Sequence, residues 1–129
     1  MPFYHALVRT GLLDEDARVA FSNDVVDIHC GATGAPRSFV HVLFTEDDRG
    51  RLVDGVNGRV DGTIRAGRTD EQKASICDGI SEALAARAGV ELATVSTGTR
   101  DIEASFTMEG GELLPEPGSP EEEAWKAAG

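Results

Sequence analysis

A strand, a helix and a second strand follow one another twice along the chain, and this repeat is what most limits its fold. Residues 2–9 are typical of a strand, and residues 12–34 carry apolar side chains at helical spacing. Gly31 and Gly34 are candidate stop signals for that helix. Residues 38–45 are dense in β-forming side chains and predict the returning strand. A helix of this length is long enough to connect two parallel strands.

The same order returns in the second half of the chain. Residues 59–66 predict a strand, and Thr69 and Gln72 have the spacing of a capping box, which opens a helix. Gly89 is expected to end this helix, and residues 91–97 are expected to form its returning strand. The second half therefore repeats the first.

The spacing of equivalent positions supports a duplication. The two helix starts, Asp14 and Asp70, lie 56 residues apart, and Val42 and Val95 in the two returning strands lie 53 apart. These periods agree to within a loop adjustment, so we expect one β-α-β unit to have been copied.

Two such units predict a single α+β domain over residues 1–118, with a four-stranded sheet and both helices on one face. The units span about residues 2–47 and 59–98, and residues 102–114 predict a C-terminal hairpin. Residues 119–129, rich in acids and prolines, are expected to form a poorly ordered or loosely docked tail. A ferredoxin-like monomer, built of similar parts in another order, is the alternative architecture.

The second face of this sheet also needs a cover. The returning strand FVHVLFT is apolar on both sides, which is typical of strands buried on both faces. A small domain with one uncovered sheet face is expected to form an oligomer.

Charge and composition exclude several classes of function. The net charge of −11, from 23 acidic and 12 basic residues, would repel nucleic acid. No apolar run is long enough for a membrane span, and the start lacks the charged and apolar regions of a signal peptide. Cys30 and Cys77 lack metal-site spacing and are interpreted as free thiols. We therefore expect a soluble cytoplasmic protein that binds neither nucleic acid nor membranes.

Four side chains are candidates for binding or catalysis. Arg65 and Arg68 flank the start of the second helix, where two guanidiniums favour a carboxylate. They could equally be solvated arginines that balance nearby acids. His29 lies near the end of the first helix and Glu109 at the hairpin turn, and each has a plain structural interpretation, as a helix-dipole partner and a turn carboxylate.

Pro2 adds a different kind of group. Loss of Met1, usual before a small second residue, would leave Pro2 with a free secondary amine. An α-amine has a pKa of about 7.7–8.0, close to what a general acid or base needs at neutral pH. Nearby arginines would favour a neutral base, and a carboxylate such as Glu109 a charged acid.

Four motifs in this order resemble a known family. PFY at the start, DIHCGATG, IRAGRTD and MEGGELLPEPG are similar to the tautomerase superfamily, and within it to the cis-3-chloroacrylic acid dehalogenase group. The resemblance covers most of residues 2–118. It implies a β-α-β fold in a homotrimer, an amino-terminal proline as the catalytic group, and chemistry without cofactor or metal.

The resemblance also implies roles for individual residues. Pro2 would be catalytic, Arg65 and Arg68 would hold a substrate carboxylate, His29 would assist binding, and Glu109 would activate water. Tyr4 matches the family's aromatic residue near the start and is expected to contact substrate.

One position departs from the dehalogenase group. The group carries a tyrosine at the end of the last core strand that helps the glutamate activate water. Here that stretch is Val95–Gly98, and the only tyrosine of the chain is Tyr4. A site without that tyrosine is expected to hydrate its substrate poorly.

Three functions remain open at this point. The favoured one is keto-enol tautomerisation of a small carboxylate by Pro2. The second is hydration, dehalogenation or decarboxylation of small unsaturated three-carbon acids similar to cis-3-chloroacrylate, with Glu109 supplying water. The third is a trimeric binding protein without catalysis, which a retained Met1 would favour because an acylated proline nitrogen cannot accept a proton usefully.

Overall fold

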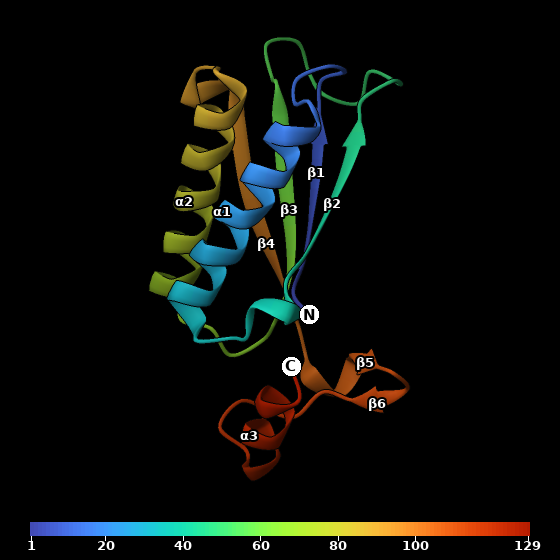
Figure 1. The fold of residues 1–129 in the computed structure, drawn as a ribbon, viewed down its shortest axis with the longest axis vertical. Coiled ribbons are helices and arrows are strands. Elements are labelled where there is room, and N and C mark those ends of the chain that lie inside the picture. Colours follow the sequence, from blue (N-terminus) through green and yellow to red (C-terminus); the bar gives the residue numbers. More distant parts are fainter.

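The computed structural model describes residues 1–129 and contains both predicted β-α-β units (Figure 1). Strands β1 (Phe3–Val8) and β2 (His41–Glu46) are parallel neighbours joined through helix α1 (Glu15–Thr33). Strands β3 (Gly58–Arg65) and β4 (Val95–Ile102) are joined in the same way through helix α2 (Asp70–Ala88). The chain ends with β5 (Met108–Glu109), β6 (Glu112–Leu113) and helix α3 (Pro120–Ala127).

The two units meet through an antiparallel pairing of β1 and β3, giving the sheet order β2-β1-β3-β4. A ferredoxin-like arrangement would split the strands of each unit. Here each unit keeps its own strands as hydrogen-bonded neighbours, so the tandem β-α-β interpretation is confirmed.

Local signals place the helix ends. The Asp14 side chain caps α1, and the left-handed Gly34, with φ 74°, ends it. Gly31 lies inside α1 and does not end it. The capping box of Thr69 and Gln72 opens α2, and Gly89, with φ 67°, ends it.

Both returning strands begin later than their sequence patterns predict. Short 3-10 turns at Arg37–Phe39 and Leu92–Thr94 come first, so β2 begins at His41 and β4 at Val95. The turns carry β-forming side chains, and their pattern alone does not separate them from a strand.

The main core lies between the sheet and its two helices, which Figure 1 shows on one side of the sheet. Alternate residues of β1 and β3 point into it, and all of them have less than 3 % of their surface exposed: Tyr4, Ala6, Val8, Val60 and Ile64. The helices contribute Phe21, Val25, Ile76, Ile80 and Leu84. Burial of this apolar surface is the main stabilising contribution to the fold.

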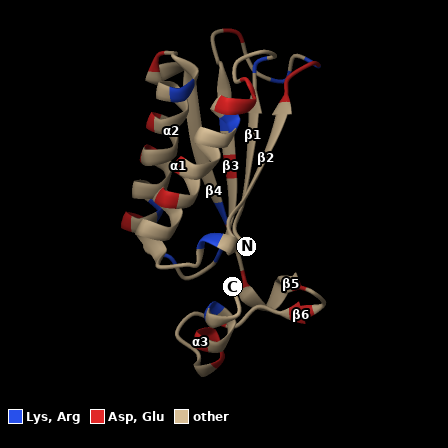
Figure 2. Ribbon diagram, in the orientation of Figure 1, with Lys and Arg blue, Asp and Glu red and all other residues tan.

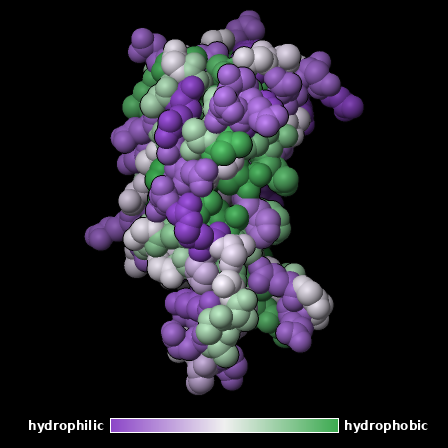
Figure 3. Space-filling view, in the orientation of Figure 1, coloured by the Kyte–Doolittle hydropathy of each residue, from purple (hydrophilic) through white to green (hydrophobic).

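The opposite face of the sheet has no cover in the single chain and is mixed in character. Phe3 and Leu43 expose 46 % and 58 % of their surface, while Arg59 and Asp61 lie between them and β4. Figure 3 shows the side of the molecule that carries α1, where hydrophobic atoms also reach the surface beside this helix and over β2. On β1 and β2 the uncovered face carries Phe3, Leu7 and Leu43 but also His5, His41 and Thr45, and β3 carries charges. The sequence expectation of an apolar second face therefore holds only in part.

Residues 103–129, here called the C-terminal segment, form a small lobe at the end of the sheet where β1 begins (Figure 1). The expected loose tail is instead a helix: Pro120 stands at its first turn with three glutamates, which Figure 2 shows as acidic. Proline and acidic residues both favour a helix start. None of the helices combines the length and hydrophobicity that a bilayer crossing requires.

Candidate active site

The amino terminus lies inside the molecule, at the junction of the sheet and the C-terminal segment. Met1 is buried against Ala104 and Leu114, and its amine forms an ion pair with the Glu109 carboxylate. Pro2 is buried at the entry to β1, where its carbonyl accepts a hydrogen bond of 3.0 Å from the His41 amide. The structure thus brings the Pro2 end of the chain and the predicted water-activating glutamate together.

Tyr4 and His29 form a buried pair beside this terminus. The Tyr4 hydroxyl lies 2.7 Å from His29 Nδ1, and both side chains are almost completely buried. Gly62, opposite Tyr4 in the sheet, makes room for the ring, because a Cβ there would lie 2.5 Å from a Tyr4 ring carbon. The pair is therefore positioned by packing as well as by its hydrogen bond.

Burial sets the protonation of this pair. Burial, aided by the Arg68 cation and the terminal ammonium, lowers the pKa of His29 to about 4. Burial also raises the pKa of the Tyr4 phenol well above its usual range. Both groups are thus neutral at neutral pH, and the hydrogen bond on Nδ1 leaves His29 Nε2 as the ring nitrogen for another partner.

The two predicted arginines lie at the end of β3 and in the turn before α2, and they differ in environment. Arg65 is 5 % exposed, donates a 2.7 Å hydrogen bond from Nη1 to the Pro115 carbonyl, and lies 2.7 Å from the Glu122 carboxylate through Nη2. Arg68 is partly buried and takes part in none of the ion pairs or side-chain hydrogen bonds. Burial and the neighbouring Arg65 lower the pKa of Arg68, which is the free cation of the site.

Glu109 is held from two sides. Besides the terminal amine, it accepts a 3.2 Å hydrogen bond from the indole N–H of Trp125. Glu109, Trp125 and Phe39 line a cavity of about 240 Å³. A volume of this size suits a small molecule of a few non-hydrogen atoms.

All six predicted residues therefore gather at one end of the sheet. Pro2 directly precedes β1, Tyr4 lies on β1, and His29 lies on α1. Arg65 ends β3, Arg68 lies in the turn before α2, and Glu109 lies on β5. Nowhere do three or more histidine, cysteine, aspartate or glutamate side chains form a group able to hold a metal ion.

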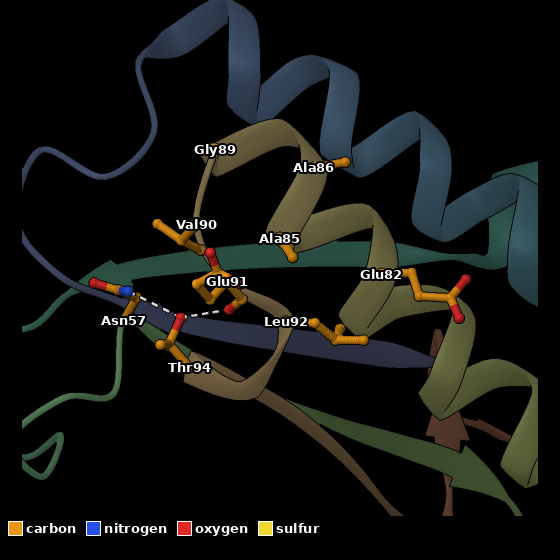
Figure 4. Close-up of a pocket in the computed structure, with 9 residues that line it drawn as sticks. All are labelled: Asn57, Glu82, Ala85, Ala86, Gly89, Val90, Glu91, Leu92 and Thr94. Carbon is orange, nitrogen blue, oxygen red and sulfur yellow. Dashed lines mark hydrogen bonds between the residues drawn. The ribbon is translucent and has the colours of Figure 1, made fainter.

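A larger hollow lies elsewhere and lacks these features. It measures about 580 Å³ and is lined by the end of α2 and the following turn, including Glu82, Gly89 and Thr94 (Figure 4). Its charged side chains are both glutamates, and its Thr94 hydroxyl already accepts a hydrogen bond of 2.9 Å from Asn57. No arginine, lysine or histidine lines it.

Sequence reasoning did not assign Glu122 or a partner for Trp125. Both belong to α3, and the ring centroid of Trp125 lies 4.9 Å from the Arg65 guanidinium and 4.3 Å from the Phe39 ring centroid. The signal that could have found α3 is its start, Ser119-Pro120 followed by three glutamates.

The tyrosine of the dehalogenase group has no substitute on β4. Strand β4 runs from Val95 to Ile102 and contains no aromatic residue, with serine, threonine and glycine following Val95. The one aromatic N–H or O–H that reaches Glu109 is the Trp125 indole.

The known proteins that this chain resembles are found among solved structures. No protein-family model matches the chain, and no curated protein matches it. Among solved structures, N1, a member of the cis-3-chloroacrylic acid dehalogenase family, is 31 % identical, with a TM-score of 0.84 over 95 % of this chain and 89 % of N1. Ps01740 is 32 % identical, with a TM-score of 0.76 over 83 % of this chain and 99 % of its own.

A more distant likeness extends to the wider superfamily. Native fused 4-OT is 22 % identical, with a TM-score of 0.77 over 86 % of this chain and 94 % of its own, and this likeness concerns the fold alone. Other fused 4-OT structures are described as symmetric and asymmetric trimers. With the fold, the order of the motifs and the similarity to N1 in agreement, the chain belongs to the cis-3-chloroacrylic acid dehalogenase family of the tautomerase superfamily.

Proposed function

We propose that the chain is a cofactor-independent tautomerase, in which removal of Met1 frees the Pro2 amine to move a proton between oxygen and carbon of a small enol or enoic carboxylate. The observation that carries this proposal is the place of the amino terminus. The terminal ammonium, here that of Met1, is buried against Glu109. Its charge, like that of Arg68, lowers the pKa of His29. An amine at this position has two neighbours of opposite charge: the Glu109 carboxylate, and the Arg68 cation, which could bind an anion.

The neighbouring groups have complementary tasks in this reaction. Arg68, joined by Arg65, would hold the substrate carboxylate and stabilise the negative charge that develops during proton transfer. Neutral His29, oriented by Tyr4, would offer a hydrogen bond without adding charge. Pro2 would then act as a base: an α-amine has a reference pKa of about 7.7–8.0, and the Arg65 and Arg68 cations favour its neutral form against the opposing effect of Glu109.

A second reaction is supported by Glu109 and by family membership. With Pro2 protonated, Glu109 would deliver water to a small unsaturated three-carbon acid, giving hydration, dehalogenation or decarboxylation. In the structure Glu109 pairs with the Met1 ammonium, and the same carboxylate beside a freed Pro2 amine would favour its protonated form. The Trp125 N–H bonds Glu109 here, and β4 supplies no tyrosine for the second water contact, so this reaction is proposed as the slower of the two.

We also propose that the protein is a cytoplasmic homotrimer. The support is the uncovered sheet face with Phe3 and Leu43, and the trimers described for fused 4-OT, whose fold the chain shares. A trimeric binding protein without catalysis is the remaining candidate, and retention of Met1 would favour it.

The test follows ketonisation of a simple enolpyruvate by ultraviolet absorbance, after intact mass has established the loss of Met1. Pro2→Ala should lower kcat/KM by at least about a hundredfold, because the catalytic amine loses its ring and secondary character. Pro36→Ala, a proline outside the site, is the matched control and should keep full activity.

Two outcomes would contradict the tautomerase proposal. One is equal turnover by the native protein and Pro2→Ala, and the other is a rate equal to buffer with Met1 absent. The same proteins are then assayed with an unsaturated three-carbon acid, and activity there that falls in Glu109→Gln would favour the hydratase reaction.

A further inference from the structure

The C-terminal helix places a carboxylate of the protein on one of the two arginines proposed to bind substrate. Glu122 Oε2 lies 2.7 Å from Arg65 Nη2, and the two side chains expose only 11 % and 4 % of their surface. Lys126 contacts the other oxygen of the same carboxylate at 3.2 Å. With α3 in this position, a ligand from solvent has no access to Arg65.

This internal ion pair is imperfect. Arg65 Nε and Glu122 Oε2 are both buried, and neither has a hydrogen-bond partner of good geometry. A guanidinium offers two N–H groups side by side to a carboxylate, and the parallel arrangement is the strong one. Glu122 therefore leaves unused a donor that a freely oriented small carboxylate could take.

The helix that carries Glu122 has no side-chain cap at its beginning. α3 has eight residues, too few for an isolated helix to be stable in water. The Ser119 hydroxyl at its N-cap makes no capping hydrogen bond and is buried without a partner. Gly118, with φ 78°, forms the left-handed turn before it.

Trp125 fastens the other side of this helix. Its ring lies on the Arg65 guanidinium and beside Phe39, and its N–H bonds Glu109. The ring also packs against the cluster of Met1, Ala104 and Leu114. Release of α3 from Arg65 would therefore also move Trp125 away from Glu109.

We propose that Glu122 is an internal competitor for the carboxylate site, and that a substrate carboxylate binds Arg65 by displacing α3. This inference rests on the proposed function in so far as Arg65 and Arg68 form the carboxylate site. Arg68, which has no ion pair, gives the incoming anion its first contact. The apparent affinity for a ligand then equals its intrinsic affinity reduced by the fraction of molecules in which α3 is released.

The experiment uses the intrinsic fluorescence of Trp125, the only tryptophan of the chain. The full-length protein is titrated with propionate at constant ionic strength, and propionamide, its uncharged analogue, serves as the ligand control. We expect propionate to shift the emission to longer wavelength in a saturable manner, as Trp125 leaves Arg65 and Phe39 for water. Propionamide should cause no shift.

The variant Glu122→Gln removes the competing charge and nearly preserves the shape. We expect it to bind propionate about tenfold more tightly than the native protein, as loss of a charge-assisted contact allows. Glu123→Gln makes the same change one residue later on an exposed position of α3 and should bind like the native protein. Thermal unfolding of each variant verifies that the body of the protein is folded.

The possible failures are distinguishable. Propionate binding that leaves the Trp125 emission unchanged, or Glu122→Gln binding no more tightly than the native protein, overturns the displacement of α3 and leaves the carboxylate site in place. Absence of propionate binding in the native protein and in Glu122→Gln alike overturns the carboxylate site itself, and with it this inference.

Discussion

The body of the protein, residues 1–102, and the C-terminal segment, residues 103–129, are stabilised in different ways. The body encloses a core of thirteen buried apolar residues, whereas the cluster at the segment has three, one of which is Met1. The segment is attached through polar contacts to Arg65 and to the terminal amine, and through this small apolar cluster and the Trp125–Phe39 contact. The body therefore supplies the stability, and the candidate site forms where a weakly attached segment meets it.

The largest effect is expected in the core of the body. Phe21 is fully buried, and its ring centroid lies 6.1 Å from that of Phe44. Phe21→Ala should lower the free energy of unfolding by about 3–5 kcal/mol, through lost burial and the cavity left behind. Val19→Ala, at a position of the same helix that is 58 % exposed, should change it by less than about 0.5 kcal/mol. Chemical denaturation measures both, and equal losses would contradict the assigned core.

A somewhat smaller effect is expected from pH at the border of the two regions. The pKa of His29 is about 4 in the folded protein against 6.5 as its ordinary value, so the unfolded chain binds the proton more readily. The contribution of neutral His29 is complete above pH 6.5 and is lost as pH falls toward 4, about 3 kcal/mol in all.

The measurement compares the unfolding free energy of the native protein with that of His29→Gln across this pH range. Their difference should shrink as pH falls, whereas His41→Gln, at an exposed histidine, should follow the native protein. A difference that stays constant from pH 7 to pH 4 would place His29 in a more solvated environment than the structure describes.

The smallest effect on stability is expected in the C-terminal segment. Trp125→Ala should lower the free energy of global unfolding by only about 1 kcal/mol, because the body keeps its own core. Amide hydrogens of α3 should exchange faster in this variant, while those of α1 and α2 keep their native protection. A loss of stability as large as that of Phe21→Ala would show that the segment is part of the folding unit.

The same division separates what the sequence predicts from what it misses. Asp14, Thr69 and Gly89 carry local capping signals that act whatever surrounds them, so both helices of the body are found from sequence. The start of β4 is misplaced because Leu92–Thr94 has strand-like side chains in a 3-10 turn, which depends on packing at the end of the sheet.

In the candidate site, too, the features with a local sequence pattern are predicted and the long-range contacts are missed. The resemblance selects six residues from motifs scattered over the chain, and the sheet brings them together. The attachment of α3 is different, because a Glu122–Arg65 pair spans 57 residues and no local pattern specifies it. A long-range ion pair of this kind is visible only once the fold has placed both partners.

The central claim, that Pro2 provides a free amine beside Glu109, is tested most directly by following Pro2 itself. In protein labelled with nitrogen-15 proline, only an amino-terminal proline among the five of the chain has a nitrogen that can take up a proton. We predict one titrating proline resonance whose pKa falls in Glu109→Gln, since a nearby carboxylate favours the ammonium form, and is unchanged in Glu112→Gln, the exposed glutamate of the same hairpin. A chain in which no proline nitrogen titrates, or one whose titration ignores the loss of Glu109, would contradict the account.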